Sequence, residues 1–323
     1  MQTGCPQTST AGAHIVPNLI TLRRLAPAML AGLLALPSAP LQAVDVTAIR
    51  AGQLLNPVDG SLTRNAVIIV KNDRIEQVGA NTAIPANARV IDLSAYTVLP
   101  GLIDSHTHIL LQPEDEHGPP PVISKSQAFR TVQGVAAARK DLEAGFTTLR
   151  DVDSEGAGFA DVAIRGGVRS IEHGMMLDDE ALGLMVEHGT YWCPTLSTYI
   201  PGTVEDDTEL QRRIVASHKE VFRKAMRMGV KIAFGTDVGA YEHGTSAREF
   251  ARMVDYGMKP IDAIRSATVR GSELLRMESQ IGTIEPGKFA DVIAVEGNPL
   301  EDIGALGRVT FVMKAGQVYK SPR

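Results

Sequence analysis

The chain has 323 residues, of which 44% are hydrophobic and 21% charged, a length that fits two domains or one large domain with an accessory part. Its 32 lysines and arginines against 37 aspartates and glutamates give a net charge of −5. No basic surplus is left to neutralise a phosphate backbone, so no nucleic-acid partner is expected. Two cysteines, 30 glycines and 18 prolines exclude disulfide-rich, collagen-like and disordered classes, which leaves a globular enzyme as the default.

Residues 1–43 have the pattern of a secretory signal peptide. Arg23 and Arg24 precede the apolar stretch 25–36, and small or helix-breaking residues follow it. The apolar stretch is too short to span a bilayer, and a buried amphipathic helix is the alternative interpretation. We therefore expect an exported protein, periplasmic or secreted, with cleavage near Ala43 and no membrane association afterwards. Loss of Cys5 would leave Cys193 as the only cysteine of the mature chain.

The two flanks of the mature chain share a β-type pattern. Short runs rich in Val and Ile, separated by turn residues, occur over residues 45–98 and again near the C-terminus over 291–319. Flanks of this kind around a different middle predict one small β-sandwich built from both chain ends, residues 44–98 and 276–323.

The middle of the chain, residues 99–275, alternates predicted helices with predicted strands. Helices are expected over 126–144, 159–165, 178–188 and 209–228, and glycines follow them. The apolar runs after these glycines are typical of buried parallel strands, which predicts an α/β fold of βα units. Each run ends on polar residues, which are Asp151, Glu172-His173, Thr195 and Thr236-Asp237. The carboxyl ends of parallel strands are where a (β/α) barrel carries its chemistry.

Two histidines follow the apolar run at residues 99–103. His106 and His108 are two residues apart on a predicted strand, so their side chains point the same way with Cβ atoms about 7 Å apart. Two converging imidazoles can hold a divalent metal such as zinc. The alternative is a pair of surface histidines, which the preceding apolar strand disfavours.

The stretch P-G-L-I-D-S-H-T-H resembles the first strand of the metal-dependent amidohydrolase superfamily. Further matching segments follow in the family's order: A-G-F-T-T-L-R-D, S-I-E-H-G, F-G-T-D and I-G-T-I-E-P-G-K-F-A-D-V-I. The subgroup that the chain resembles most is imidazolonepropionase-like and Xaa-Pro-dipeptidase-like. The resemblance implies a TIM-type barrel and a metal-activated water that attacks an amide carbon.

The resemblance also implies roles for four residues of this chain. The metal ligands of the first strand fall on His106 and His108, and that of the sixth strand falls on His173. The aspartate of the eighth strand, which touches metal and moves the proton of the attacking water, falls on Asp237. From the residues alone, His173 could instead be structural and Asp237 could be a helix N-cap.

Two ligands of the family have no counterpart in this chain. Neither the lysine of the fourth strand nor the histidine of the fifth is present, and Lys231 lies at the opposite end of its strand. The middle has about 175 residues where a full barrel takes about 250. We therefore expect an incomplete barrel of about five of eight strands, formed by internal loss of strands 3–5 near residues 163–170. One zinc ion is then more consistent with the ligands than two.

The remaining histidines and Cys193 carry weaker expectations. His243 could line the substrate pocket or be a plain loop residue, and His117 lies in a proline-rich stretch that could cover the site. His188 would interact with a helix C-terminus, His218 would be solvated, and Cys193 would pack in the core.

Two functions from different classes remain open. The first is a hydrolase of amide or peptide-like C–N bonds in a small molecule such as a dipeptide, cyclic amide or N-acyl amino acid. The second is a non-catalytic remnant of such an enzyme. An open barrel would leave an unpaired strand edge, which also allows a homo-oligomer.

Overall fold

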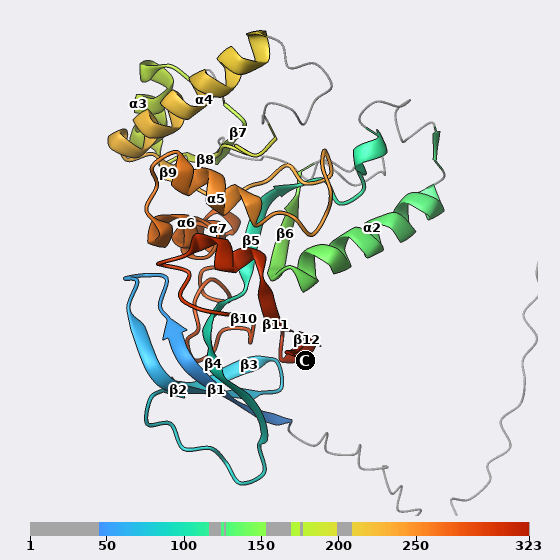
Figure 1. Ribbon diagram of the computed structural model, residues 1–323, viewed down its shortest axis with the longest axis vertical. Helices are drawn as coiled ribbons and strands as arrows, with labels where there is room; N and C mark the ends of the chain where they lie inside the picture. The colour runs from blue at the N-terminus through green and yellow to red at the C-terminus, as the bar shows by residue number, and fades with distance from the viewer. Residues whose placement is uncertain are drawn as a thin grey trace, which may run out of the picture. The chain divides into compact units, whose positions relative to one another are not determined.

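A computed structural model describes residues 45–115, 124–125, 127–152, 169–174, 177–198 and 209–322 (Figure 1). The predicted signal peptide, the predicted helix at 159–165, residues 163–168 of the expected junction and His117 lie outside these ranges. No helix within the described ranges is long and apolar enough to cross a membrane.

Strands from both ends of the chain form one seven-stranded sheet (Figure 1). Its spatial order is β12 (Gln317–Lys320), β11 (Val309–Lys314), β10 (Val292–Val295), β4 (Arg89–Pro100), β1 (Val46–Leu55), β2 (Leu62–Lys71) and β3 (Arg74–Gly79). β4 pairs in parallel with β1 and antiparallel with β10. Because β4 uses both of its edges, the strands from the two chain ends belong to one hydrogen-bonded sheet, and the predicted two-layer sandwich stays a prediction.

A glycine permits the close approach of β1 and β4. The register between these strands shifts between Ala51 and Gln53. A Cβ atom at Gly52 would lie 2.1 Å from the carbonyl oxygen of Ser94, so a larger residue would push the strands apart. Just before this point, Ile49 on β1 and Leu93 on β4 are fully buried in the core of the sheet.

Five short parallel strands carry the site. β5 (Leu102–Thr107) pairs with β6 (Phe146–Asp151), and a second sheet has the order β7 (Ser170–Glu172), β8 (Tyr191–Cys193), β9 (Lys231–Ile232). The chain after β9 joins the two sheets, because the N–H of Ser105 donates to the carbonyl oxygen of Phe234 over 2.9 Å. A parallel bridge between Thr107 and Val238 extends this contact. The strand order is therefore β7-β8-β9-β5-β6, and the described residues contain no ladder between β6 and β7.

Three of the four helices predicted from the glycine pattern are present within one residue of the predicted bounds, and the fourth, at 159–165, lies outside the described residues. The three are α2 (Gln127–Glu143), α3 (Asp179–His188) and α4 (Glu209–Met228). Asp178 caps α3 by accepting a hydrogen bond from the N–H of Ala181 over 2.9 Å, and Gly189 ends it with φ 66°. Further short elements are η1 (Pro113–Asp115), α5 (Arg248–Asp255), α6 (Pro260–Ser266), α7 (Val269–Leu275) and η2 (Ile303–Gly307).

His218 of α4 is buried, which corrects the expectation that it is solvated. Its ring centroid lies 5.8 Å from that of Trp192, and only 1% of the residue is exposed. The charged neighbours in sequence point elsewhere, because His218 shares one helix face with the buried Phe222 and Ala225 at helical spacing. Burial lowers the pKa of His218 to about 4.

An aromatic cluster joins the parallel strands to α5. The rings of Phe234 and Phe250 lie 4.3 Å apart between centroids, and that of Phe146 lies 5.5 Å from Phe234. All three side chains are fully buried. Phe234 precedes Asp237 by three residues, so the packing of α5 against Phe234 supports the segment that carries Asp237.

Replacement of Phe250 by alanine is expected to lower the free energy of unfolding by about 3–5 kcal/mol, because it leaves a cavity among fully buried rings. Leu184 of α3 is 48% exposed and provides the control at a large apolar side chain outside the core. Leu184→Ala should change the free energy of unfolding by no more than about 0.5 kcal/mol. Urea unfolding followed by circular dichroism measures the free energy of unfolding of both variants. Equal losses in the two variants would contradict the conclusion that the aromatic cluster stabilises the fold.

Candidate metal centre

The end of β5 presents two histidines on the same side. His106 lies within the strand and His108 directly after it, and their ring centroids are 5.4 Å apart. His106 is buried and His108 is partly buried. Asp104, two residues earlier, is fully buried and accepts hydrogen bonds from Thr236 Oγ1 over 2.6 Å and from the N–H of His106 over 3.2 Å. This carboxyl group fixes β5 against the segment after β9.

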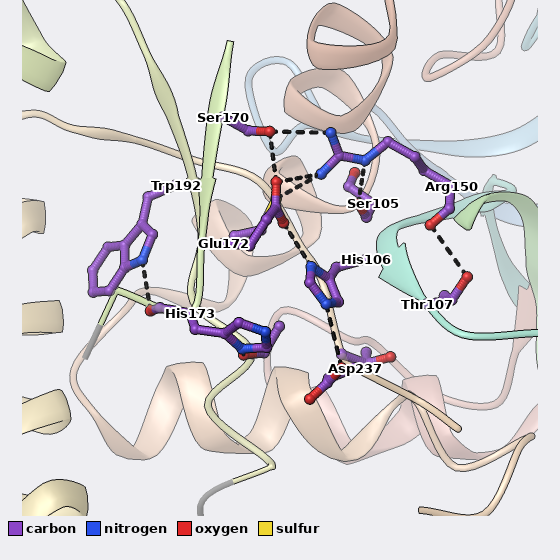
Figure 2. Close-up of polar contacts among 12 residues, drawn as sticks. Ser105, His106, Thr107, Arg150, Ser170, Glu172, His173, Trp192 and Asp237 are labelled. Atoms are coloured by element: carbon purple, nitrogen blue, oxygen red, sulfur yellow. Dashed lines mark hydrogen bonds and ion pairs between the residues drawn. The ribbon is translucent and has the colours of Figure 1, made fainter. Parts of the chain in front are cut away.

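Asp237 faces the histidine pair from that segment. Its N–H donates to the carbonyl oxygen of His106 over 2.8 Å. Its Oδ1 lies 3.0 Å from His108 Nε2 and 3.3 Å from His106 Nε2. One potential ligand atom from each of the three side chains lies within 4.8 Å of the others, and Figure 2 shows Asp237 below His106. The structure thus brings together three of the four metal ligands that the resemblance implies.

His173 lies beside this group but is not part of it. Its ring centroid is 4.8 Å from that of His106, and its Nδ1 is 2.7 Å from Thr195 Oγ1. The backbone is left-handed at His173 (φ 62°), Thr195 (φ 49°) and Asp237 (φ 62°). Residues with a Cβ rarely adopt this conformation, and such strain concentrates at functional sites.

A carboxylate on β7 contacts the other side of His106 (Figure 2). Glu172 Oε2 lies 2.7 Å from His106 Nδ1, while Glu172 Oε1 accepts hydrogen bonds from Ser170 Oγ (2.6 Å) and Arg150 Nη2 (2.7 Å). Arg150 also donates from Nη1 to Ser170 Oγ over 3.0 Å. The pattern of polar strand ends singled out Glu172 but not Arg150, whose partners come from another strand.

The charges in the site favour a bound cation. Burial opposes ionisation of Asp237, yet the imidazoles of His106 and His108, which lie 3.3 and 3.0 Å from its Oδ1, hold the pKa of its carboxyl well below the usual range. Burial likewise opposes ionisation of Glu172, but the hydrogen bond to His106 and the charge of Arg150 lower its pKa to about 2. For His106, burial lowers the pKa, but the nearby carboxylate of Asp237 and the hydrogen bond to Glu172 outweigh burial and raise the pKa to about 9.

The donor atoms fit a divalent metal. His106 Nε2 is buried and faces Asp237 without the geometry of a hydrogen bond. Two imidazole nitrogens and one carboxylate oxygen are a ligand set that catalytic zinc sites use, with a fourth position left for water or substrate. His106, His108 and Asp237 could therefore hold such an ion.

Glu249 of α5 contacts the loop that follows β8, next to the site. No sequence pattern predicted this role. Glu249 is fully buried, and its two oxygens accept hydrogen bonds from the N–H groups of Leu196 (2.8 Å) and Ser197 (2.7 Å). These residues follow Thr195, so Glu249 fixes the loop that contacts His173. Burial raises the pKa of Glu249 to about 7, against the effect of these hydrogen bonds and of the Arg248 charge.

His243 does not line the site. Its side chain is 1% exposed, with Nδ1 2.9 Å from Asp141 Oδ2 and Nε2 3.1 Å from the carbonyl oxygen of Leu111. Both ring nitrogens are engaged, so His243 attaches its loop to α2 and leaves no ring nitrogen for a substrate.

Two other residues named in the sequence analysis lie away from the site. Cys193 is buried as expected, and His188 is exposed at the end of α3.

The raised pKa of Glu249 predicts a pH dependence of stability. Between about pH 4.5 and 7 the unfolded chain releases this proton while the folded chain retains it, so the free energy of unfolding falls as pH rises. Glu249→Gln removes this contribution, and its free energy of unfolding should fall less steeply over the same window. Urea titrations at several pH values measure the slopes, with Glu278→Gln as the control at an exposed position. If the free energy of unfolding of Glu249→Gln and of the wild type changes with pH at the same slope, a raised pKa of Glu249 is contradicted.

Comparison with known sequences identifies the family. The Amidohydrolase family matches residues 154–319. Ochratoxinase of Aspergillus niger is 34% identical over 172 residues, which are 50% of this chain and 35% of that protein. Imidazolonepropionase of Symbiobacterium thermophilum is 28% identical over 170 residues, which are 50% of this chain and 37% of that protein. The chain thus spans little more than a third of the length of these curated relatives.

Solved structures agree with this relationship. A Xaa-Pro dipeptidase with bound methionine has a TM-score of 0.73 at 28% identity, covering 86% of this chain and 100% of that one. The structure of A. niger ochratoxinase has a TM-score of 0.69 at 21% identity, covering 86% and 96%, and shows the same mixed α/β fold. The resemblance seen in the sequence motifs is confirmed, and because the family match covers more than half of the residues, this chain belongs to the amidohydrolase family.

Proposed function

We propose that this chain hydrolyses amide or peptide-like C–N bonds of a small molecule with the help of one divalent metal, for which zinc is our candidate. The observation that carries the proposal is the convergence of His106, His108 and Asp237 at the carboxyl ends of parallel strands. The dipeptidase among the structural relatives supports an amide-type substrate. His173 remains a candidate further ligand because its ring lies next to that of His106.

The residues of the site divide the chemistry between them. When bound, a divalent ion supplies a water of lowered pKa and polarises the carbonyl group of the substrate. His106 and His108 would hold the ion through their Nε2 atoms. Asp237 Oδ1 faces these nitrogens, which leaves Oδ2 to accept the proton of the attacking water and to return it to the leaving amine.

We further propose that the barrel of this chain is incomplete. By resemblance, the strands in the order β7-β8-β9-β5-β6 correspond to strands 6, 7, 8, 1 and 2 of the family. Strands 3–5 would then be absent, together with the lysine and the histidine that the family places on strands 4 and 5. This ligand loss supports a single ion.

Export and association are separate proposals. A periplasmic or secreted location is supported by Arg23, Arg24 and the apolar stretch after them.

Association of copies through α2 is supported by three exposed apolar side chains along this helix, Phe129, Val132 and Val135. We propose no nucleic-acid partner, because the net charge is −5.

The metal proposal predicts the behaviour of a double variant. His106→Ala/His108→Ala should reduce bound zinc to background and abolish hydrolysis of an amide and dipeptide panel, because it removes two of three ligands. Elemental analysis of the purified protein and amine release from the panel measure these effects. His188→Ala, which changes an exposed histidine at the end of α3, should leave both unchanged.

Two other results would count against the proposal. Equal residual hydrolysis in the double variant and the wild type would eliminate this site as its origin. Stoichiometric zinc in the wild type without turnover of any substrate would instead favour a non-catalytic member of the family, which is the alternative function.

A further inference from the structure

We infer that Glu172 is a positioning residue, which, with Arg150, orients His106 so that Nε2 faces the metal position. The inference rests on the metal site proposed above and goes beyond it, because neither Glu172 nor Arg150 belongs to the ligand group. The three residues come from three different strands, β5, β6 and β7 (Figure 2).

The contact between Glu172 and His106 selects one arrangement of the imidazole. Glu172 Oε2 lies 2.7 Å from Nδ1, so a proton on Nδ1 is donated to the carboxylate. Nε2, on the opposite side of the ring, faces Asp237 Oδ1 at 3.3 Å without the geometry of a hydrogen bond. An imidazole whose Nδ1 donates to a carboxylate has its Nε2 lone pair available for a metal, and its basicity is raised.

Arg150 holds the carboxylate in place. Its Nη2 donates to Glu172 Oε1, its Nη1 donates to Ser170 Oγ, and its Nε donates to the carbonyl oxygen of Ser105. The same guanidinium therefore contacts the residue before His106 and the carboxylate that orients the His106 ring. Arg150 and Glu172 are each 26% exposed, so their charges are screened less than those of a surface pair.

The pair also bridges two strands that have no ladder between them. β6 and β7 belong to different sheets, and Arg150 on β6 contacts Ser170 and Glu172 on β7 through its side chain alone. These contacts hold β7 at a fixed distance from β5, and therefore hold Glu172 within reach of His106.

An amide at position 172 cannot replace the carboxylate. The two oxygens of Glu172 accept from two different donors, His106 Nδ1 and Arg150 Nη2. A glutamine has one acceptor oxygen and one NH₂ donor, so it would turn a donor toward either the arginine or the histidine. In the second case Nδ1 would have to accept, and the proton would move to Nε2, where it blocks metal binding.

The experiment compares zinc affinity in the wild type, Glu172→Gln and Glu273→Gln, measured by competition with a chromophoric chelator. Glu273 is the matched control, because it accepts from Arg270 over 2.7 Å and from the hydroxyl of Tyr191 over 3.0 Å at the opposite ends of the strands. Glu172→Gln should bind zinc about 10–100-fold more weakly, the range found when partners of metal-ligating histidines are removed. Glu273→Gln should bind zinc as the wild type does.

A spectroscopic readout separates positioning from stability. In the zinc-loaded wild type, the Nδ1 proton of His106 should give a downfield NMR signal typical of a hydrogen bond to a carboxylate, and Glu172→Gln should shift or abolish it. Unfolding midpoints of all variants are measured alongside. If Glu172→Gln fails to fold, Ser170→Ala removes one donor to Glu172 Oε1 and should weaken zinc binding by a smaller factor.

The outcomes distinguish this inference from the proposed function. Zinc binding of equal strength in Glu172→Gln and the wild type would overturn the positioning role while the metal site stands. If Ser170→Ala changes neither the zinc affinity nor the NMR signal of the His106 Nδ1 proton, the positioning role is likewise overturned. A wild-type chain that binds no zinc would overturn the proposed metal site, and the inference with it.

Discussion

The pairing of β5 with the segment after β9 is the constraint on which the site depends. The N–H of Asp237 donates to the carbonyl oxygen of His106, and the buried carboxyl of Asp104 accepts from Thr236. These bonds, one between backbone groups and one between side chains, fix β5 and the segment after β9 against each other. Strand alternation then directs His106 and His108 toward Asp237, which follows with a left-handed φ of 62°. The ligand geometry is therefore a consequence of backbone pairing.

Charge balance explains why this pairing favours a cation. Asp237 and Glu172 face His106 from opposite sides, and both carboxyls have lowered pKa values. Among the described residues, the guanidinium of Arg150 donates to Ser105, Ser170, Glu172 and Cys193, so it compensates the charge of Glu172 and not that of Asp237. Either protonated histidines or a bound metal would balance the charge of Asp237. Metal ligation leaves the histidines neutral and uses the same nitrogens.

The sequence predicts those features that follow from local spacing. The histidine pair follows from alternation along one strand, and the ends of α3 follow from Asp178 and Gly189. Features that depend on contacts between distant segments could not be predicted in this way. Arg150 looked like an ordinary residue before Asp151, because its partners come from β7, and His218 looked solvated because its sequence neighbours are charged. His243 was ambiguous until its contact with Asp141, over a hundred residues away, was known.

Side-chain contacts from neighbouring segments help to hold the three-residue strand β7. Within the described part of the chain, β7 forms a ladder with β8 and none with β6. Arginines hold it at both ends: Arg150 contacts Ser170 and Glu172, while Arg169, just before the strand, donates to the carbonyl oxygen of Leu274 over 2.8 Å at the end of α7. Because guanidinium groups supply several donors in a fixed geometry, two of them can supplement the ladder between β7 and β8. The position of Glu172, and through it the orientation of His106, then depends on these side-chain contacts as well as on backbone pairing.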